Sequence, residues 1–172
     1  MNPQLRFIFA RRSVRSYRPG DIGEEILRDL LEAAMAAPSA CAKDPWHFVV
    51  VREAAVLRRL AEGLPNGRML ADAAAGIAVC GSLAEAHDGQ LSYLLQDCSA
   101  AIENLLLAAA ALGLGACWLG VHPRAERTAH LREVLSLPEG VVPVGVVSLG
   151  LPREQPPART RYQEAKVHRG RW

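Results

Sequence analysis

The chain has 172 residues, of which 50% are hydrophobic and 22% are charged, and its formal net charge is +2. This length suits a single domain with a real core, and this balance excludes a disordered chain. The small net charge hides an uneven distribution, because residues 1–20 carry +5, residues 151–172 carry +4 and the middle carries −7. Basic ends on an acidic body argue against a broad nucleic-acid-binding face.

The hydrophobic pattern predicts helices and strands in mixed order. Apolar residues at helical spacing, acidic residues at the start and Pro38 beyond the end predict a helix over 24–37. The β-branched run WHFVVV and the run GIAVCG predict buried strands at 46–51 and 76–81. The other expected elements are helices at 2–9, 53–63, 88–112 and 123–137 (the last with Pro123 in its first turn), a strand at 141–150, and a short strand or turn at 115–120. This order lacks strict βαβ alternation, which favours the α+β class.

Two segments point beyond a single compact chain. The helix over 88–112 is apolar nearly all round in its second half, so we expect it to be buried on every side. In so small a chain, a second subunit would then cover part of it. Residues 151–160, LPREQPPART, are proline-rich and polar, which indicates an extended arm.

The usual catalytic motifs are missing from the sequence. The four cysteines form no C-x-x-C pair, and the histidines and cysteines have no metal-ligand spacing, so we expect reduced thiols, a cytoplasmic protein and no metal. No uninterrupted apolar run is long enough to span a bilayer, so we expect no membrane. Gly113, Gly115 and Gly120 follow a helix with the wrong spacing for a dinucleotide loop. Cys41 is either an exposed reactive thiol or, as we favour, a small apolar filler. A protein without an obvious acid, base, nucleophile or metal is one that can obtain its chemistry from a cofactor.

The stretch RRSVRSYRP, residues 11–19, places four arginines within eight positions. Guanidinium groups together with the Ser13 hydroxyl are the groups that bind a phosphate or another delocalised anion. The alternatives are a solvated charged turn and a surface stripe for a polyanion. The second basic cluster, at the far end of the chain, leaves open that the two ends meet.

Five segments together resemble the FMN-dependent nitroreductase family. They are RRSVR with Tyr17, APSACAKDPWHFVVV, QDCSAAIENLLLAAAALGLGACWLGVHP, VVPVGVVSLGLP and ARTRYQEAKVHRGRW, and they follow the family's order over almost the whole chain. The chain looks like one of the short members. The resemblance implies one nitroreductase-like α+β domain over residues 1–172, with a central, mostly antiparallel sheet flanked by helices. It also implies an intertwined homodimer with FMN at the subunit interface, and a C-terminal arm, residues 152–172, packed on the partner.

The resemblance carries functional roles onto matching positions. Arg11, Arg12 and Ser13 match positions that hold the phosphate and ribityl end of FMN, and Arg159 and Arg161 match a basic pair that closes on the phosphate. The positions near the flavin ring are Arg15 at the pyrimidine edge, the turn formed by Pro38, Ser39 and Ala40, the loop formed by Trp118, Leu119 and Gly120, and, through a loose alignment, Arg68.

The implied reaction passes a hydride from NADH or NADPH to bound FMN and then to a nitroaromatic, quinone or flavin acceptor, in ping-pong order. Arg15 is the expected catalytic residue, because it would stabilise negative charge on the ring. Ala42 and Asp44 replace the family's usual Asn and Gln, and an ionised Asp44 donates no hydrogen bond. The alternatives are a protein that binds or processes flavin without nitroreductase turnover and, far behind, a nucleic-acid-binding module.

Overall fold

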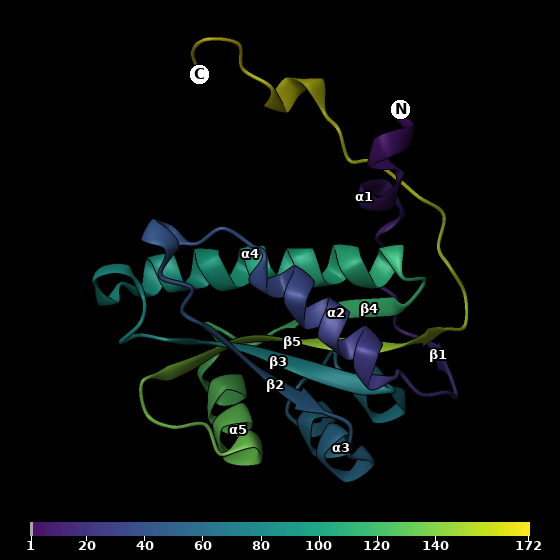
Figure 1. The fold of residues 1–172 in the computed structure, drawn as a ribbon, viewed down its shortest axis with the longest axis vertical. Coiled ribbons are helices and arrows are strands. Elements are labelled where there is room, and N and C mark those ends of the chain that lie inside the picture. The colour runs from purple at the N-terminus through teal and green to yellow at the C-terminus, as the bar shows by residue number, and fades with distance from the viewer. Residues whose placement is uncertain (1) are drawn as a thin grey trace.

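A five-stranded sheet lies at the centre of the protein, and all of its strand pairs are antiparallel (Figure 1). The computed structural model describes residues 2–172. The strands follow the order β1-β5-β3-β2, and β4 also pairs with β5. The strands are β1 (Tyr17–Arg18), β2 (Trp46–Val51), β3 (Ala75–Ser82), β4 (Gly115–Gly120) and β5 (Val141–Pro152). The predicted α+β class with an antiparallel sheet is confirmed.

Helices cover both faces of the sheet: α2 and α4 lie on one face, and α3 and α5 lie on the other (Figure 1). The helices are α1 (Arg6–Ala10), α2 (Glu24–Met35), α3 (Ala54–Glu62), α4 (Leu91–Ala111) and α5 (Ala125–Leu135). Short 3-10 turns are η1 (Pro3–Leu5), η2 (Ala40–Ala42), η3 (Arg68–Asp72), η4 (His87–Gly89) and η5 (Glu164–Lys166).

The core consists of two hydrophobic clusters, one on each side of the sheet. Along β3, Ile77 and Val79 join the cluster beneath α2 and α4, whereas Ala78 and Cys80 join the cluster beneath α3 and α5. This alternation follows from the two-residue period of a strand, and both faces of β3 are buried because helices cover both. The sheet is therefore a fixed platform for the segments that lie at its edges.

Several predicted boundaries need correction. The predicted helix over 88–112 begins only at Leu91, because Asp88 has a φ of 51° in the left-handed region and Gln90, just before the helix, is extended. The predicted helix over 123–137 begins at Ala125, with Pro123 in the turn before it. The strand over 46–51 is not fully buried: β2 is the last strand on its side of the sheet and His47 is exposed.

The long helix α4 is only partly covered within one chain. Its second half buries Ile102, Leu105 and Ala109 against the sheet, but Leu107 is half-buried and Leu112, just beyond its end, is exposed. The prediction that this half is buried on every side is therefore wrong for a single chain. By length and composition, α4 is also the one helix among residues 2–172 that could cross a membrane, although Asp97 and Glu103 interrupt its apolar run. It packs as the core helix between α2 and the sheet.

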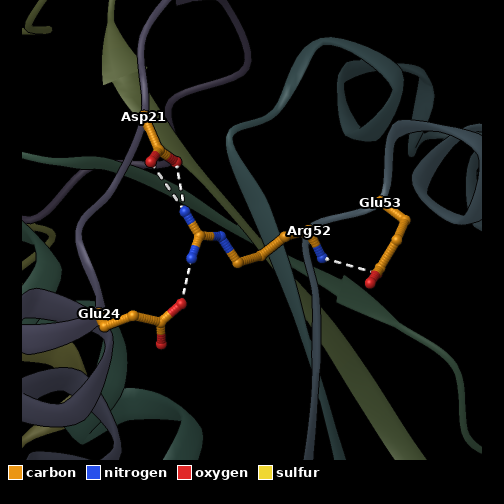
Figure 2. Close-up of polar contacts among 4 residues, drawn as sticks. All are labelled: Asp21, Glu24, Arg52 and Glu53. Carbon is orange, nitrogen blue, oxygen red and sulfur yellow. Dashed lines mark hydrogen bonds and ion pairs between the residues drawn. The ribbon is translucent and has the colours of Figure 1, made fainter.

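An exposed ion cluster ties the start of α2 to the end of β2 (Figure 2). Arg52 donates from Nη2 to both carboxylate oxygens of Asp21, at 2.7 and 2.8 Å, and from Nη1 to Glu24, while its backbone N–H donates to Glu53 at 3.3 Å. The Arg52 guanidinium lowers the pKa of Asp21 below its ordinary value. Because the cluster faces solvent, it fixes the path of the chain into α2 more than it adds to stability.

The C-terminal segment passes beside the N-terminal segment. After β5 the chain runs past α1 and ends beyond it (Figure 1), and residues 157–172 are exposed. The backbone N–H of Arg159 donates to the carbonyl of Phe9 at 3.2 Å, and Arg12 donates from Nη1 to the carbonyl of Pro157. Residues 153–163 have no regular secondary structure apart from a bend at their start.

Candidate functional site

The loop over residues 11–16 runs beside the start of β4 and carries the first basic cluster. The backbone N–H of Val14 donates to the carbonyl of Ala116 at 2.9 Å, so β4 fixes the loop's position. The loop and the C-terminal segment enclose a pocket of about 350 Å³. Its lining residues are Ile8, Arg11, Arg12, Ser13, Arg15, Arg159 and Arg161. We call it the basic pocket; it shows that the two basic ends of the chain do meet.

Positive charge in the basic pocket is poorly compensated. The guanidiniums of Arg161 and Arg12 lower the pKa of Arg159 below its ordinary value, because like charges disfavour the protonated form. Arg11 is paired, since its Nε lies 3.2 Å from a carboxylate oxygen of Glu103 on α4. Among the salt bridges between residues 2–172, none involves the other arginines of this pocket. Such a cluster fits a multiply charged anion such as a phosphate.

A second pocket, of about 400 Å³, adjoins the first, and Arg15 lines both. We call it the ring pocket. Its lining residues are Arg15, Leu64, Asn66, Gly67, Cys117, Trp118, Leu119, Gly120 and Arg127. The predicted loop over 118–120 is in fact the end of strand β4, because it pairs with β5 through Gly120 opposite Gly145. Beyond Ala116 no strand among residues 2–172 pairs with the other edge of β4, so its last residues face the pocket.

Five residues of the ring pocket were missed by sequence reasoning: Leu64, Asn66, Gly67, Cys117 and Arg127. The Pro-Asn-Gly run at 65–67 is a turn signal that could have drawn attention to Asn66 and Gly67. A Cβ on Gly67 would lie 2.7 Å from the Cβ of Leu64 and 3.0 Å from its carbonyl oxygen, so the turn admits no side chain there. Burial raises the pKa of Cys117 despite the nearby Arg15, which keeps this residue a neutral thiol.

The turn at residues 38–40 lies elsewhere. Neither Pro38, Ser39 nor Ala40 lines the basic pocket or the ring pocket. The backbone N–H of Ala40 donates at 2.9 Å to Asp97, which is in the first half of α4. Glu103, which pairs with Arg11 of the basic pocket, is in the second half of that helix. Figure 1 shows this blue turn at the opposite end of α4 from α1. Within one chain, the predicted site residues therefore fall into two groups.

Asp44 completes this turn in place of the family's usual Gln. Its backbone N–H donates to the Ser39 hydroxyl at 3.0 Å, and that hydroxyl donates back to the Asp44 carboxylate. Cys41, at the tip of the turn, is exposed and its Sγ lies 3.8 Å from Nε2 of His87, so it is not an apolar filler. Arg68 is exposed at the start of η3 and lines neither pocket, although it follows Gly67 directly.

A buried tyrosine anchors the loop that carries Arg11 to Arg15. The Tyr17 hydroxyl donates to the carbonyl of Val14 at 3.0 Å and lies 2.7 Å from the Ser148 hydroxyl on β5. The ring packs over Gly150, where an added Cβ would lie 2.6 Å from it. This anchor holds the basic loop against the sheet.

Substituting Tyr17 by Phe is expected to change how stability depends on alkaline pH. Burial raises the pKa of Tyr17 to about 12, above the ordinary value of about 10. The folded protein thus keeps the phenol proton more tightly than the unfolded chain, so stability is full below pH of about 10 and falls as the pH rises towards 12. Between those values the wild type should lose about 2 kcal/mol more than Tyr17→Phe in urea unfolding. Equal losses in both proteins would contradict the expectation.

The fold and the site define an α+β protein in which an anion pocket adjoins a second pocket along a strand edge. The family model of the nitroreductase family matches residues 8–64 and 62–151. A candidate NADH dehydrogenase/NAD(P)H nitroreductase of Archaeoglobus fulgidus is 44% identical, and the match covers 100% of both chains. The crystal structure of a protein of the same description from Parabacteroides distasonis has a TM-score of 0.93 at 37% identity, again over 100% of both chains.

A further solved structure, a candidate nitroreductase from Desulfovibrio desulfuricans, is in complex with FMN. It matches with a TM-score of 0.85 and 29% identity, over 100% of this chain and 99% of that one. The chain described here belongs to the nitroreductase family, which places it among the oxidoreductases.

Proposed function

We propose that the protein is an FMN-dependent NAD(P)H oxidoreductase, and the observation that carries this proposal is the pair of adjoining pockets that share Arg15. The basic pocket suits the phosphate of FMN, and the strand edge beside it suits the ring. When bound, FMN supplies hydride transfer from NADH or NADPH to an acceptor, in ping-pong order. Nitroaromatics, quinones and free flavin are the proposed acceptors. The FMN complex of the relative from Desulfovibrio desulfuricans supports the choice of cofactor.

In this proposal the basic pocket holds the phosphate. Guanidinium forks from both ends of the chain donate to its oxygens, and the Ser13 hydroxyl adds a further hydrogen bond. Arg11 is pre-oriented by its ion pair with Glu103. The mutual repulsion of Arg12, Arg159 and Arg161 is relieved by the anion, which makes binding of the phosphate favourable.

The ring pocket would orient the flavin ring. Arg15 lies at the junction of the two pockets, so its guanidinium would donate to the pyrimidine edge, where negative charge accumulates. The backbone of Trp118, Leu119 and Gly120 would face the ring along the free edge of β4. Arg68, beside the pocket, would be a second basic residue near the pyrimidine.

We further propose that a second copy of the chain completes the site. The turn at 38–40 lines neither pocket of its own chain, so it would contact a flavin held by the partner. Leu5, Phe7 and Ile8 are each more than 40% exposed, and α4 is only half-covered, which leaves an apolar surface for a homodimer contact. The exposed arm over 152–172 would pack on the partner. Sedimentation of a monomer at micromolar concentration would contradict this arrangement.

The free thiols support a proposal for the cellular compartment. All four cysteines are free, and three of them are buried. Free thiols fit a reducing compartment, so we propose that the enzyme works in the cytoplasm. Among residues 2–172 no group of three metal-ligating side chains comes together.

An absorbance spectrum tests the proposed function. The purified protein is expected to be yellow, or to become so with added FMN, and to bleach under anaerobic NADH or NADPH. A yellow protein that neither nucleotide bleaches would favour flavin binding without turnover. A colourless protein that ignores added FMN would overturn the proposal.

A further inference from the structure

Arg127 is the one charged residue of the ring pocket without a role in the proposed function. It comes from α5, and its Nη1 donates to the carbonyl of Gly120 at 2.8 Å. Gly120 lies four residues along β4 from Ala116, where the basic loop contacts this strand. That separation is about 13 Å along a strand. Arg127 therefore borders the end of the ring pocket that is remote from the loop contact.

The charge of Arg127 is not balanced by the protein. Its Nε is buried and has no hydrogen-bond partner within residues 2–172. No salt bridge in this part of the chain involves Arg127, and no acidic residue lines the ring pocket. An anion that reaches such a half-buried guanidinium is bound favourably. Folding has already removed part of the guanidinium's hydration, so binding has to remove less of it.

The other walls of the ring pocket define the shape of such an anion. Trp118 is 37% exposed and supplies the main apolar surface, while Leu64 and Leu119 are buried beneath the pocket wall. Asn66 adds an amide that can donate or accept. An exposed tryptophan beside convergent polar groups suits a flat aromatic molecule that also carries polar substituents. A guanidinium at one end adds preference for a carboxylate, which it can bind with two parallel hydrogen bonds.

We propose that Arg127 is a specificity residue that selects negatively charged acceptors, and that aromatic carboxylates are the preferred class. The inference rests on the proposed function, since it assumes that the flavin ring lies at the Arg15 end of the ring pocket and that the acceptor enters beside it, at the Arg127 end. Arg15 serves the cofactor, whereas Arg127 serves the acceptor. The two arginines of the pocket thus have separate tasks.

Calorimetric titration of the FMN-loaded protein with two probes of the same shape tests this inference. The probes are p-nitrobenzoate, which is charged, and p-nitrobenzamide, which is neutral. The wild type is expected to bind the carboxylate about tenfold more tightly than the amide. Arg127→Met should bring the ratio of the two affinities close to one. Arg127→Lys should give an intermediate ratio, because lysine keeps the positive charge but cannot form the two parallel hydrogen bonds of a guanidinium.

Arg124→Met is the matched control. Arg124 is exposed three residues earlier and does not line the ring pocket, so this change removes the same charge without touching the ligand. An unchanged ratio in Arg127→Met, or an equal loss in Arg124→Met, would overturn the inference. Binding requires no turnover, so the titration decides this point even if NADH and NADPH fail to bleach the protein. Conversely, a protein that bleaches but binds both probes equally overturns this inference alone.

Discussion

Replacing Arg12 and Arg159 together by Gln is expected to weaken FMN binding at least about 100-fold while riboflavin binding changes little. Both guanidiniums line the basic pocket, and the nearby positive charge already lowers the pKa of Arg159. A hydrogen bond to a charged group contributes about 1.5–3 kcal/mol, and each 1.4 kcal/mol is about tenfold in affinity. Riboflavin lacks the phosphate, so its affinity should not depend on these two guanidiniums. Titration of flavin fluorescence with protein measures both affinities.

A second double variant, Arg6→Gln with Arg18→Gln, controls for net charge. Both residues are exposed and neither lines the basic pocket, although they belong to the same N-terminal segment. It should keep the wild-type preference for FMN over riboflavin. If the Arg12 and Arg159 variant loses both flavins equally, its effect comes from the lost hydrogen bond between Arg12 and Pro157, which holds the C-terminal segment, and not from the phosphate. An equal loss of FMN affinity in the control variant would mean that the phosphate does not bind in the basic pocket.

The elements that the sequence predicts well are those with strong local patterns. The helix α2 has a regular apolar spacing and acidic first turn, and it ends at Met35, three residues before the predicted stop at Pro38. The strands β3 and β5 are long apolar runs and were predicted within two residues at each end. By contrast, β1 has only two residues, and its existence depends on pairing with the end of β5, which no local pattern reveals.

The basic pocket could be anticipated because both of its halves are visible as charge in the sequence. What brings them together is a backbone contact between Phe9 and Arg159, which are 150 positions apart and which no periodicity connects. The ring pocket could be predicted only in part. Arg127 gave no signal because an arginine on a helix is ordinarily a solvated charge. Its position over Gly120 depends on how α5 packs beneath the sheet.

The turn at 38–40 is a different case. The Pro-Ser-Ala motif can be recognised in the sequence, but the sequence does not show whether the turn contacts a ligand bound to its own chain or to a second copy. In one chain the turn is held by Asp97, at a place on α4 away from both pockets. The proposed homodimer would bring the turn of one chain and the basic loop of the other to the same flavin.

Substituting Arg15 by Ala is expected to slow flavin reduction by about 100-fold at saturating NADH or NADPH, in a protein that still folds and binds FMN. Arg15 is exposed at the junction of the two pockets, so its removal leaves the core and the phosphate ligands in place. Loss of one preorganised donor to a developing negative charge typically lowers the rate by about 10²–10³. Anaerobic stopped-flow absorbance with either nucleotide measures the rate.

The reduction potential of the bound flavin separates an electrostatic role of Arg15 from a purely structural one. If the guanidinium stabilises the reduced, more negative ring, Arg15→Ala should lower the potential by about 30 mV for each tenfold of lost stabilisation. Arg15→Lys keeps the charge but loses the fork, so it should recover part of both the rate and the potential. Arg18→Ala removes a neighbouring charge outside both pockets and should change neither. A slow Arg15→Ala variant with an unaltered potential would mean that Arg15 positions the nicotinamide or the loop and does not stabilise the ring.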